Sequence, residues 1–173
     1  MVELKDFTVN FGRLKLGKHD LKYQIDASFL SLFDYNSIER CSTSVTVLIE
    51  KTRANLLTFN FALDGSADLA CDRCLDMLSY PVKGEYHFLL KLENQEDSDD
   101  DEIVYLPPDA YEINLASYIY DFQLLSLPFK KDCIRENHPS CEEVNNILLN
   151  NNGDDEDDKD DLDPRWNDLK KLL

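Results

Sequence analysis

The chain has 173 residues, 43% of them hydrophobic and 10% aromatic, a composition that is typical of a folded globular domain and excludes a disordered protein. Its formal net charge of −17 is concentrated in two acidic runs, residues 93–102 and 154–163. These runs hold 15 of the 35 acidic residues and one of the 18 basic residues, so the remainder has a net charge of only −3. This acidity argues against a simple binder of nucleic-acid phosphates, which requires clustered Lys and Arg.

The sequence shows no export signal and no apolar run of the roughly 18 residues that a membrane-spanning helix needs. We therefore expect a cytoplasmic protein that has no membrane partner and keeps its cysteines reduced. The common catalytic motifs, namely the P-loop, GxGxxG, GxSxG and HExxH, do not occur in it. The sequence thus predicts a protein that is not an enzyme and has no small-molecule substrate.

The predicted fold is α+β: residues 1–149 form one domain, in which an antiparallel, partly barrel-like sheet packs against one main helix. Alternating or β-branched residues predict strands at residues 20–26, 42–51, 56–63, 66–70 and 80–92. Between two of them, Asp64-Gly65 is a two-residue hairpin signal, so the chain is expected to turn back there. His87 falls on the polar face of the last strand and is predicted to be a surface residue.

The main helix is predicted to begin at a cap formed by Asn114 and to end before Pro128. Its core-facing stripe is predicted to contain Leu115, Ile119, Phe122 and Leu125. Outside the main elements, residues 93–102 are predicted to form an acidic loop and residues 150–162 a flexible acidic tether. Residues 163–173 (DPRWNDLKKLL) then form a short amphipathic helix, which must dock on its own domain or in the groove of a partner because it is too short to be stable alone.

Four of the five cysteines have the spacing of a metal site. Cys71 and Cys74 form a C-x2-C pair, and Cys133 and Cys141 follow as C-x7-C after 58 intervening residues. Zinc prefers four thiolate or imidazole ligands in a tetrahedron, and a C-x2-C turn between two strands supplies two of them as a zinc knuckle. Four thiolates leave no open coordination position, so the ion would be structural. Nearby basic residues would offset the negative charge of such a centre: Arg73, Lys130, Lys131 and Arg135.

Other interpretations of the cysteines stay open at this point. His138 lies between the two later cysteines and is a competing ligand. The cysteines are alternatively buried thiols without a metal, or a redox pair, although the flanks of C-x2-C are strands and not the βαβ unit that a thioredoxin-like motif expects. Cys41 stands apart from the others and is predicted to be a core residue.

An ordered set of motifs in the second half of the chain resembles the YceD family, the large ribosomal RNA subunit accumulation proteins of bacteria and plastids. The motifs are CDRCL at residues 71–75, LSLP at 125–128, Cys133 five places after that proline, Cys141, and the terminal DPRWNDLKKL. The resemblance covers roughly residues 71–173. It implies a role in making or stabilising large-subunit ribosomal RNA, without a known catalytic activity. It also implies that Cys133 is a metal ligand, because family members often carry His or Cys there.

We therefore expect a ribosome-biogenesis factor that acts mainly through protein contacts. Its acidic runs would attract a basic ribosomal or ribosome-assembly protein, with ribosomal RNA in the same complex. The predicted partner-binding residues are in the C-terminal helix: Asp163, Pro164, Arg165, Trp166 and Leu169. The alternatives are a zinc-stabilised module that binds RNA directly through its Arg13–Lys22 face, and a thiol oxidoreductase.

Overall fold

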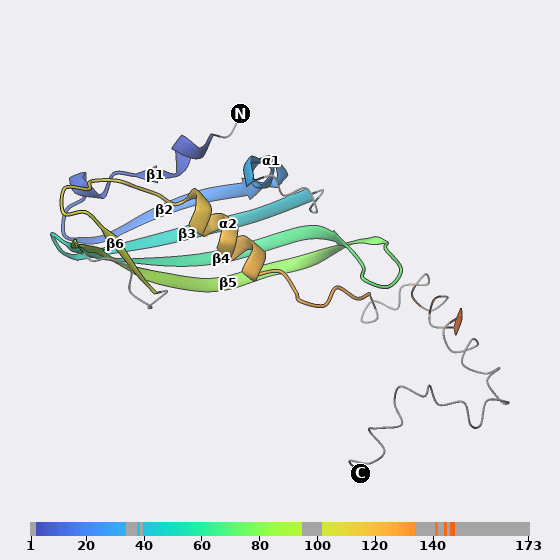
Figure 1. The fold of residues 1–173 in the computed structure, drawn as a ribbon. Helices are drawn as coiled ribbons and strands as arrows, with labels where there is room; N and C mark the ends of the chain where they lie inside the picture. The colour runs from blue at the N-terminus through green and yellow to red at the C-terminus, as the bar shows by residue number, and fades with distance from the viewer. Residues whose placement is uncertain are drawn as a thin grey trace, which may run out of the picture.

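The segments with alternating apolar and polar residues form a central sheet of five strands, shown in Figure 1. The computed structural model describes residues 3–33, 38, 40–94, 102–133, 141, 144, 146 and 147. The five strands lie side by side in the order β2 (Gly17–Asp26), β3 (Arg40–Arg53), β4 (Leu56–Ala70), β5 (Met77–Leu92) and β6 (Ile103–Leu106). Along β3 and β4 nearly every second side chain is buried, so one face of the sheet carries the core.

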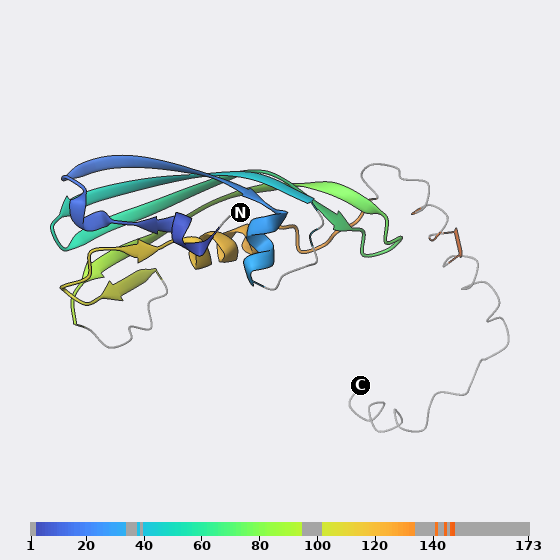
Figure 2. The same ribbon diagram turned by 90° about the horizontal axis from the view of Figure 1, so that it is seen from above.

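A second layer covers this core face, as Figure 2 shows from above. It contains the helix α2 (Ala116–Leu125) and the N-terminal segment of the chain. The remaining elements are the 3-10 helices η1 (Leu4–Phe7), η2 (Phe11–Arg13) and η3 (Ser31–Phe33), the strands β1 (Thr8–Val9) and β7 (Ile113–Asn114), and the helix α1 (Ala27–Leu30). β1 pairs with β7, which ties the N-terminal segment to the residues just before α2. None of the described helices has the length and apolar character needed to cross a membrane.

The α+β prediction is confirmed, whereas the partly barrel-like sheet is wrong, because the sheet is open. In the described part of the chain, β2 and β6 are the two edge strands and do not pair with each other. The layer formed by α2 and the N-terminal segment buries the apolar face, so the sheet forms a core without closing on itself. β6 also runs parallel to β5, so the sheet is mixed and not purely antiparallel.

The hairpin predicted at Asp64-Gly65 is also wrong, because β4 continues straight through this pair. Gly65 lies opposite Thr43 on β3 and Val82 on β5, so strands on both sides override the local turn signal. A Cβ atom at Gly65 would lie 2.2 Å from the backbone oxygen of Ser42, so the glycine permits a close approach of two strands and does not form a turn. The chain makes its tight turn earlier, at Ala54-Asn55, which joins the end of β3 to the start of β4.

The outer margin of β5 is only partly covered. β6 pairs with Leu89–Leu92, so the first twelve residues of β5 pair with β4 alone among the described strands. The N–H of Leu89 points away from β4, since it donates to the backbone oxygen of Glu102 at 2.8 Å. Backbone groups of alternate residues point to the same side of a strand, so Pro81 has its nitrogen on this open margin. The proline therefore removes no hydrogen bond from the β4–β5 ladder.

Helix α2 crosses the core face of the sheet, as its apolar spacing predicts. Leu115 and Ile119 are fully buried, and Phe122 stacks on the ring of Tyr86 with centroids 4.5 Å apart. The prediction for Leu125 is wrong, because this side chain is 68% exposed. At the C-terminal end of α2 the helix face that carries Leu125 turns to solvent, so the stripe covers only the earlier turns.

Polar contacts fix both ends of α2. The side-chain oxygen of Asn114 accepts a hydrogen bond from the backbone N–H of Ala116 at 2.8 Å, so the predicted capping contact is present, although Leu115 occupies the cap position itself. Near the other end Gln123 is fully buried, and its Nε2 donates to Thr43 Oγ1 at 3.1 Å and to Cys41 Sγ at 3.3 Å. Cys41, predicted as a core residue, is half-buried and packs against the core.

A buried lysine connects the sheet to the N-terminal layer. Lys51 on β3 is only 9% exposed, and its Nζ donates to the backbone oxygens of Phe11 at 3.0 Å and Leu14 at 3.2 Å. These carbonyls lie at the two ends of η2, and that of Phe11 also accepts a hydrogen bond from the N–H of Leu14. Lys51 thus holds the N-terminal segment on the sheet through two hydrogen bonds from a buried ammonium group.

We predict that Lys51→Met lowers the free energy of unfolding by about 1–3 kcal/mol, because it removes two hydrogen bonds that a buried charged group donates. Urea denaturation monitored by far-ultraviolet circular dichroism measures this difference in the free energy of unfolding. Lys22→Met, at an exposed position of β2, is the control and should change stability by less than about 0.5 kcal/mol. Equal effects of the two substitutions would contradict this role of Lys51.

Candidate metal centre

The C-x2-C turn connects β4 to β5 at one end of the sheet, as predicted for a knuckle. The backbone N–H of Cys71 donates to the oxygen of Asp76 at 2.9 Å, and the N–H of Leu75 donates to the oxygen of Cys71 at 3.0 Å. Leu75 has a φ of +63°, the left-handed conformation that closes a tight turn. This local geometry places Cys71 and Cys74 on the same side of the turn.

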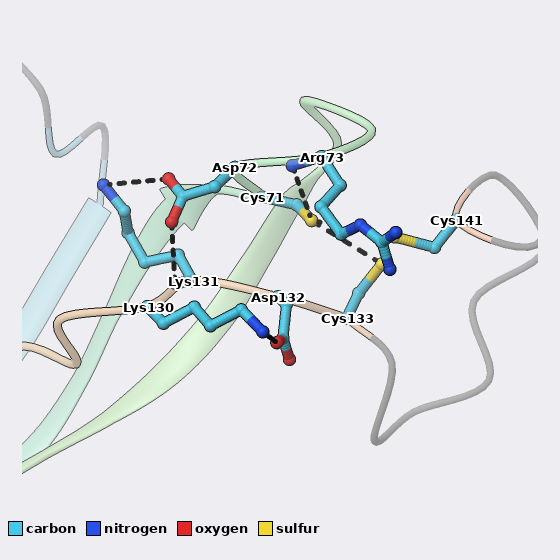
Figure 3. Close-up of polar contacts among 8 residues, drawn as sticks. All are labelled: Cys71, Asp72, Arg73, Lys130, Lys131, Asp132, Cys133 and Cys141. Atoms are coloured by element: carbon cyan, nitrogen blue, oxygen red, sulfur yellow. Dashed lines mark hydrogen bonds and ion pairs between the residues drawn. The ribbon is translucent and has the colours of Figure 1, made fainter. Parts of the chain in front are cut away.

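The chain that follows α2 returns to this turn and binds its backbone (Figure 3). The N–H of Asp72 donates to the backbone oxygen of Lys131 at 2.7 Å. In the opposite direction, the N–H of Lys131 donates to the carboxylate of Asp72 at 2.8 Å. This exchange joins residues 59 positions apart and brings Cys133, two residues further on, beside the turn. The role of Asp72 was missed in the sequence, where its only signal is its position next to Cys71.

The four cysteines converge, with all of their Sγ atoms within 4.8 Å of one another. Three of the six Sγ–Sγ distances are 3.7 Å for Cys71–Cys133, 3.9 Å for Cys71–Cys141 and 3.6 Å for Cys74–Cys133. A tetrahedron of sulfurs about 2.3 Å from a central zinc has edges of about 3.8 Å. A disulfide would require about 2.05 Å, and all the cysteines are free. The spacing therefore fits one tetrahedral ion and no disulfide.

Burial separates this cluster from solvent. Cys71, Cys133 and Cys141 are at most 2% exposed, Cys74 is half-buried, and Leu78 of β5 packs against the group. Among the residues that the structure describes, these cysteines are the one group of three or more potential metal-ligand side chains that lie together. His138, the competing ligand, lies outside the described residues. Four sulfurs at tetrahedral spacing already complete the coordination of zinc, so an ion held here would stabilise the fold and leave no position for a substrate.

Lys130 and Lys131 were expected to offset the negative charge of the cysteine cluster, but in the structure both form ion pairs with carboxylates. Lys130 pairs with Asp132 at 2.9 Å, and Lys131 pairs with Asp72 at 3.4 Å (Figure 3). Each lysine thus has a carboxylate, a stronger acceptor than a sulfur, within reach. Arg73 does contribute to the cluster, because its backbone N–H donates to Cys71 Sγ at 3.4 Å. Arg135, the fourth predicted cation, lies outside the described residues.

The surroundings of the sulfurs favour unequal protonation of the free thiols. Burial opposes ionisation of Cys71, but backbone N–H groups of Cys74 and Arg73 outweigh it and lower the pKa of Cys71 to about 6. Contact with the sulfur of Cys141, together with burial, raises the pKa of Cys133 well above its usual range. Four thiolates this close repel one another, so a divalent cation is the natural means of ionising all of them.

Comparison with protein-family models gives a match over the part of the chain that holds the four cysteines. The sequence model of YceD, described as large ribosomal RNA subunit accumulation protein YceD, matches residues 59–173. The chain belongs to the YceD family. The YceD match begins within β4, twelve residues before Cys71, and includes all four clustered cysteines. A search of curated proteins and a search of solved structures found no match.

The other predicted site residues, Asp163, Pro164, Arg165, Trp166 and Leu169, lie outside the described residues, although the YceD match extends over them. His87 is exposed, as predicted, and lies 3.9 Å from a carboxylate oxygen of Glu102. The structure therefore brings together the four predicted ligands and leaves the predicted partner-binding segment as an expectation.

We predict that the purified protein contains one zinc ion per chain and that Cys133→Ser loses it. Losing one of four ligands should lower the thermal midpoint, because metal binding contributes directly to the folding free energy. Atomic absorption and thermal denaturation measure the two effects. Cys41→Ser is the matched control, since Cys41 is half-buried but does not belong to the cluster, and it should keep its zinc. A metal-free wild-type protein would contradict the assignment.

Proposed function

We propose that this YceD-family protein is a non-enzymatic ribosome-biogenesis factor that supports the synthesis, processing or stability of large-subunit ribosomal RNA. The family description is the basis for the link to large-subunit ribosomal RNA. The observation that favours a scaffold over a catalyst is the set of four sulfurs that lie within 4.8 Å of one another, which suits a structural zinc ion. In this proposal the ion holds the end of the sheet in shape, and the surface of the protein performs the function.

A thiol oxidoreductase is a weaker explanation of the same cysteines. Such an enzyme needs an accessible thiolate to attack its substrate. Here the sulfur with the lowered pKa is that of Cys71, and Cys71 is fully buried. The thiol of the cluster whose pKa is lowered is therefore not accessible to a substrate.

We further propose that the protein acts mainly through protein contacts, with a basic ribosomal or ribosome-assembly protein as its partner. The acidic run Glu93–Glu102 connects β5 to β6, and both of its ends are hydrogen-bonded to the sheet: the N–H of Glu93 donates to the oxygen of Leu106 at 3.0 Å. Its two described ends, Glu93 and Glu102, thus lie at the edge of the sheet formed by β6, and we propose that the charge of the run attracts a basic surface. The second run precedes residues 163–173, in which Trp166 and Leu169 would provide apolar anchors.

Direct RNA binding is the second candidate, and one observation favours it. Four cations, Arg13, Lys15, Lys18 and Lys22, are exposed around η2 and β2, and none forms an ion pair with a described acidic residue. Exposed Asp20 interrupts them, however, and phosphate binding depends on concentrated positive charge. We therefore place protein contacts first.

In cells depleted of the protein, we predict that the ratio of large-subunit to small-subunit ribosomal RNA falls. Wild type and Cys41→Ser should restore the ratio, whereas Cys133→Ser should not, because loss of the ion destabilises the fold and lowers the abundance of the protein. Quantitative RNA blots and blots of protein level measure both quantities. An unchanged ratio in depleted cells would overturn the link to ribosomal RNA.

We predict that affinity capture of the protein from growing cells recovers a basic protein partner and that removal of residues 150–173 abolishes this recovery. Capture at two salt concentrations separates the two candidate functions. Direct RNA binding requires a steep loss of ribosomal RNA with salt, which substitution of Lys18 and Lys22 would weaken. Recovery of ribosomal RNA without loss of any partner from the truncated chain would contradict the protein-contact mechanism.

A further inference from the structure

Large apolar side chains are exposed at the end of the molecule that carries the cysteine cluster. Phe129 is fully exposed, and Leu125 at the end of α2 is exposed as well. Both precede the contact of Lys131 with the C-x2-C turn, and Leu75 of that turn is 75% exposed. We name Leu75, Leu125 and Phe129 the apolar patch. Exposed apolar side chains at one place on a surface mark a docking site for another segment.

The segment that carries Phe129 is held on both sides. On one side, the Oγ atom of Ser126 lies 3.1 Å from the hydroxyl oxygen of Tyr86 on β5. On the other side, Lys131 exchanges two hydrogen bonds with Asp72. Phe129 therefore projects into solvent from a backbone that is fixed at two points. A surface arranged in advance loses little conformational freedom when it binds a ligand.

The C-terminal residues 163–173 have the chemistry that such a patch requires. Trp166, Leu169 and Leu173 share one face of the short helix that the sequence predicts there. A helix of this length is marginal in water by itself, so it needs a surface against which to bury that face. Trp166 is suited to Phe129, because aromatic pairs attract each other beyond the effect of burial alone.

The charges beside the patch and in the segment are complementary. Asp121 is exposed on α2, one helical turn before Leu125 and on the same side of the helix. In the C-terminal segment, Lys170 and Lys171 follow directly after Leu169. Opposite charges around an apolar contact fix the orientation of the docked segment.

The connection along the chain favours docking within one molecule. Phe129 lies four residues before Cys133, so the patch is at most roughly 14 Å from the cysteine cluster at that point. Cys141 belongs to the same cluster, and Ile147 is the last described residue before the C-terminal segment. A flexible chain as long as residues 148–162 spans roughly 20 Å on average. Such a tether gives an effective concentration of about millimolar, which a separate ligand rarely reaches.

We propose that residues 163–173 dock on the apolar patch of their own chain, with Trp166 against Phe129. The protein-contact mechanism uses Trp166 and Leu169 as anchors, so a partner must displace the segment from the patch before it binds. The inference thereby adds to the proposed function a competing contact within the molecule.

The fluorescence of Trp166 tests this docking, because the chain contains a single tryptophan. Emission and quenching by acrylamide are measured on the purified full chain, with the urea-unfolded chain as reference. Trp166 of the wild type should emit at shorter wavelength than in the unfolded chain and be quenched less. Phe129→Ser should move both quantities toward the unfolded reference, whereas Phe129→Leu should retain most of the protection.

Leu16→Ser is the matched control, since Leu16 is also exposed but precedes β2 at the opposite end of the sheet, and it should behave like wild type. Far-ultraviolet circular dichroism verifies that each variant is folded. The inference is overturned if wild-type Trp166 is quenched as in the unfolded chain, which would leave the patch to a separate partner.

Unchanged quenching in Phe129→Ser also overturns the inference, because the segment would then dock elsewhere. Protection that increases with protein concentration overturns it in favour of docking on a second copy. The measurement uses the purified protein alone, so failure here leaves the ribosomal RNA ratio and the recovery of a partner from cells as separate tests of the proposed function.

Discussion

The pair of hydrogen bonds exchanged between Asp72 and Lys131 is the constraint on which the rest of the structure depends. It closes the chain segment that contains β5, β6 and α2 into one loop, whose ends meet at the C-x2-C turn. Closing so long a loop costs chain entropy, which a four-ligand ion would offset. With its start tied down through β7 and its end through Cys133, α2 is held across the sheet and seals the core.

The fold also separates two concentrations of negative charge. The cysteines lie where Ala70 meets Met77, whereas the acidic run begins just after Leu92, at the opposite end of β5. A strand of 16 residues spans roughly 50 Å, several times the distance of about 8–10 Å over which charges are felt at physiological salt. Glu93, the first acidic residue of this run, therefore lies too far from the cysteines to influence their ionisation.

Local patterns in the sequence were sufficient for most of the long strands and for the turn that holds Cys71 and Cys74, because alternation and C-x2-C spacing are short-range properties. These local patterns failed where contacts between distant segments of the chain determine the structure. Asp64-Gly65 looks like a hairpin until strands on both sides are known, and no local signal shows that β6 is parallel to β5. Lys130 and Lys131 are close to the clustered cysteines in sequence, but they form ion pairs with Asp132 and Asp72.

Pro81, on the uncovered margin of β5, has a further consequence for how the molecule behaves in a crowded cell. A bare strand margin is a template on which another chain can add a strand and begin to aggregate. A proline offers no N–H to an incoming strand, and the exposed charged residues Lys83 and Glu85 follow it in β5. The outer margin of β5 is therefore uncovered by a described strand over most of its length, but it is a poor template for unwanted assembly.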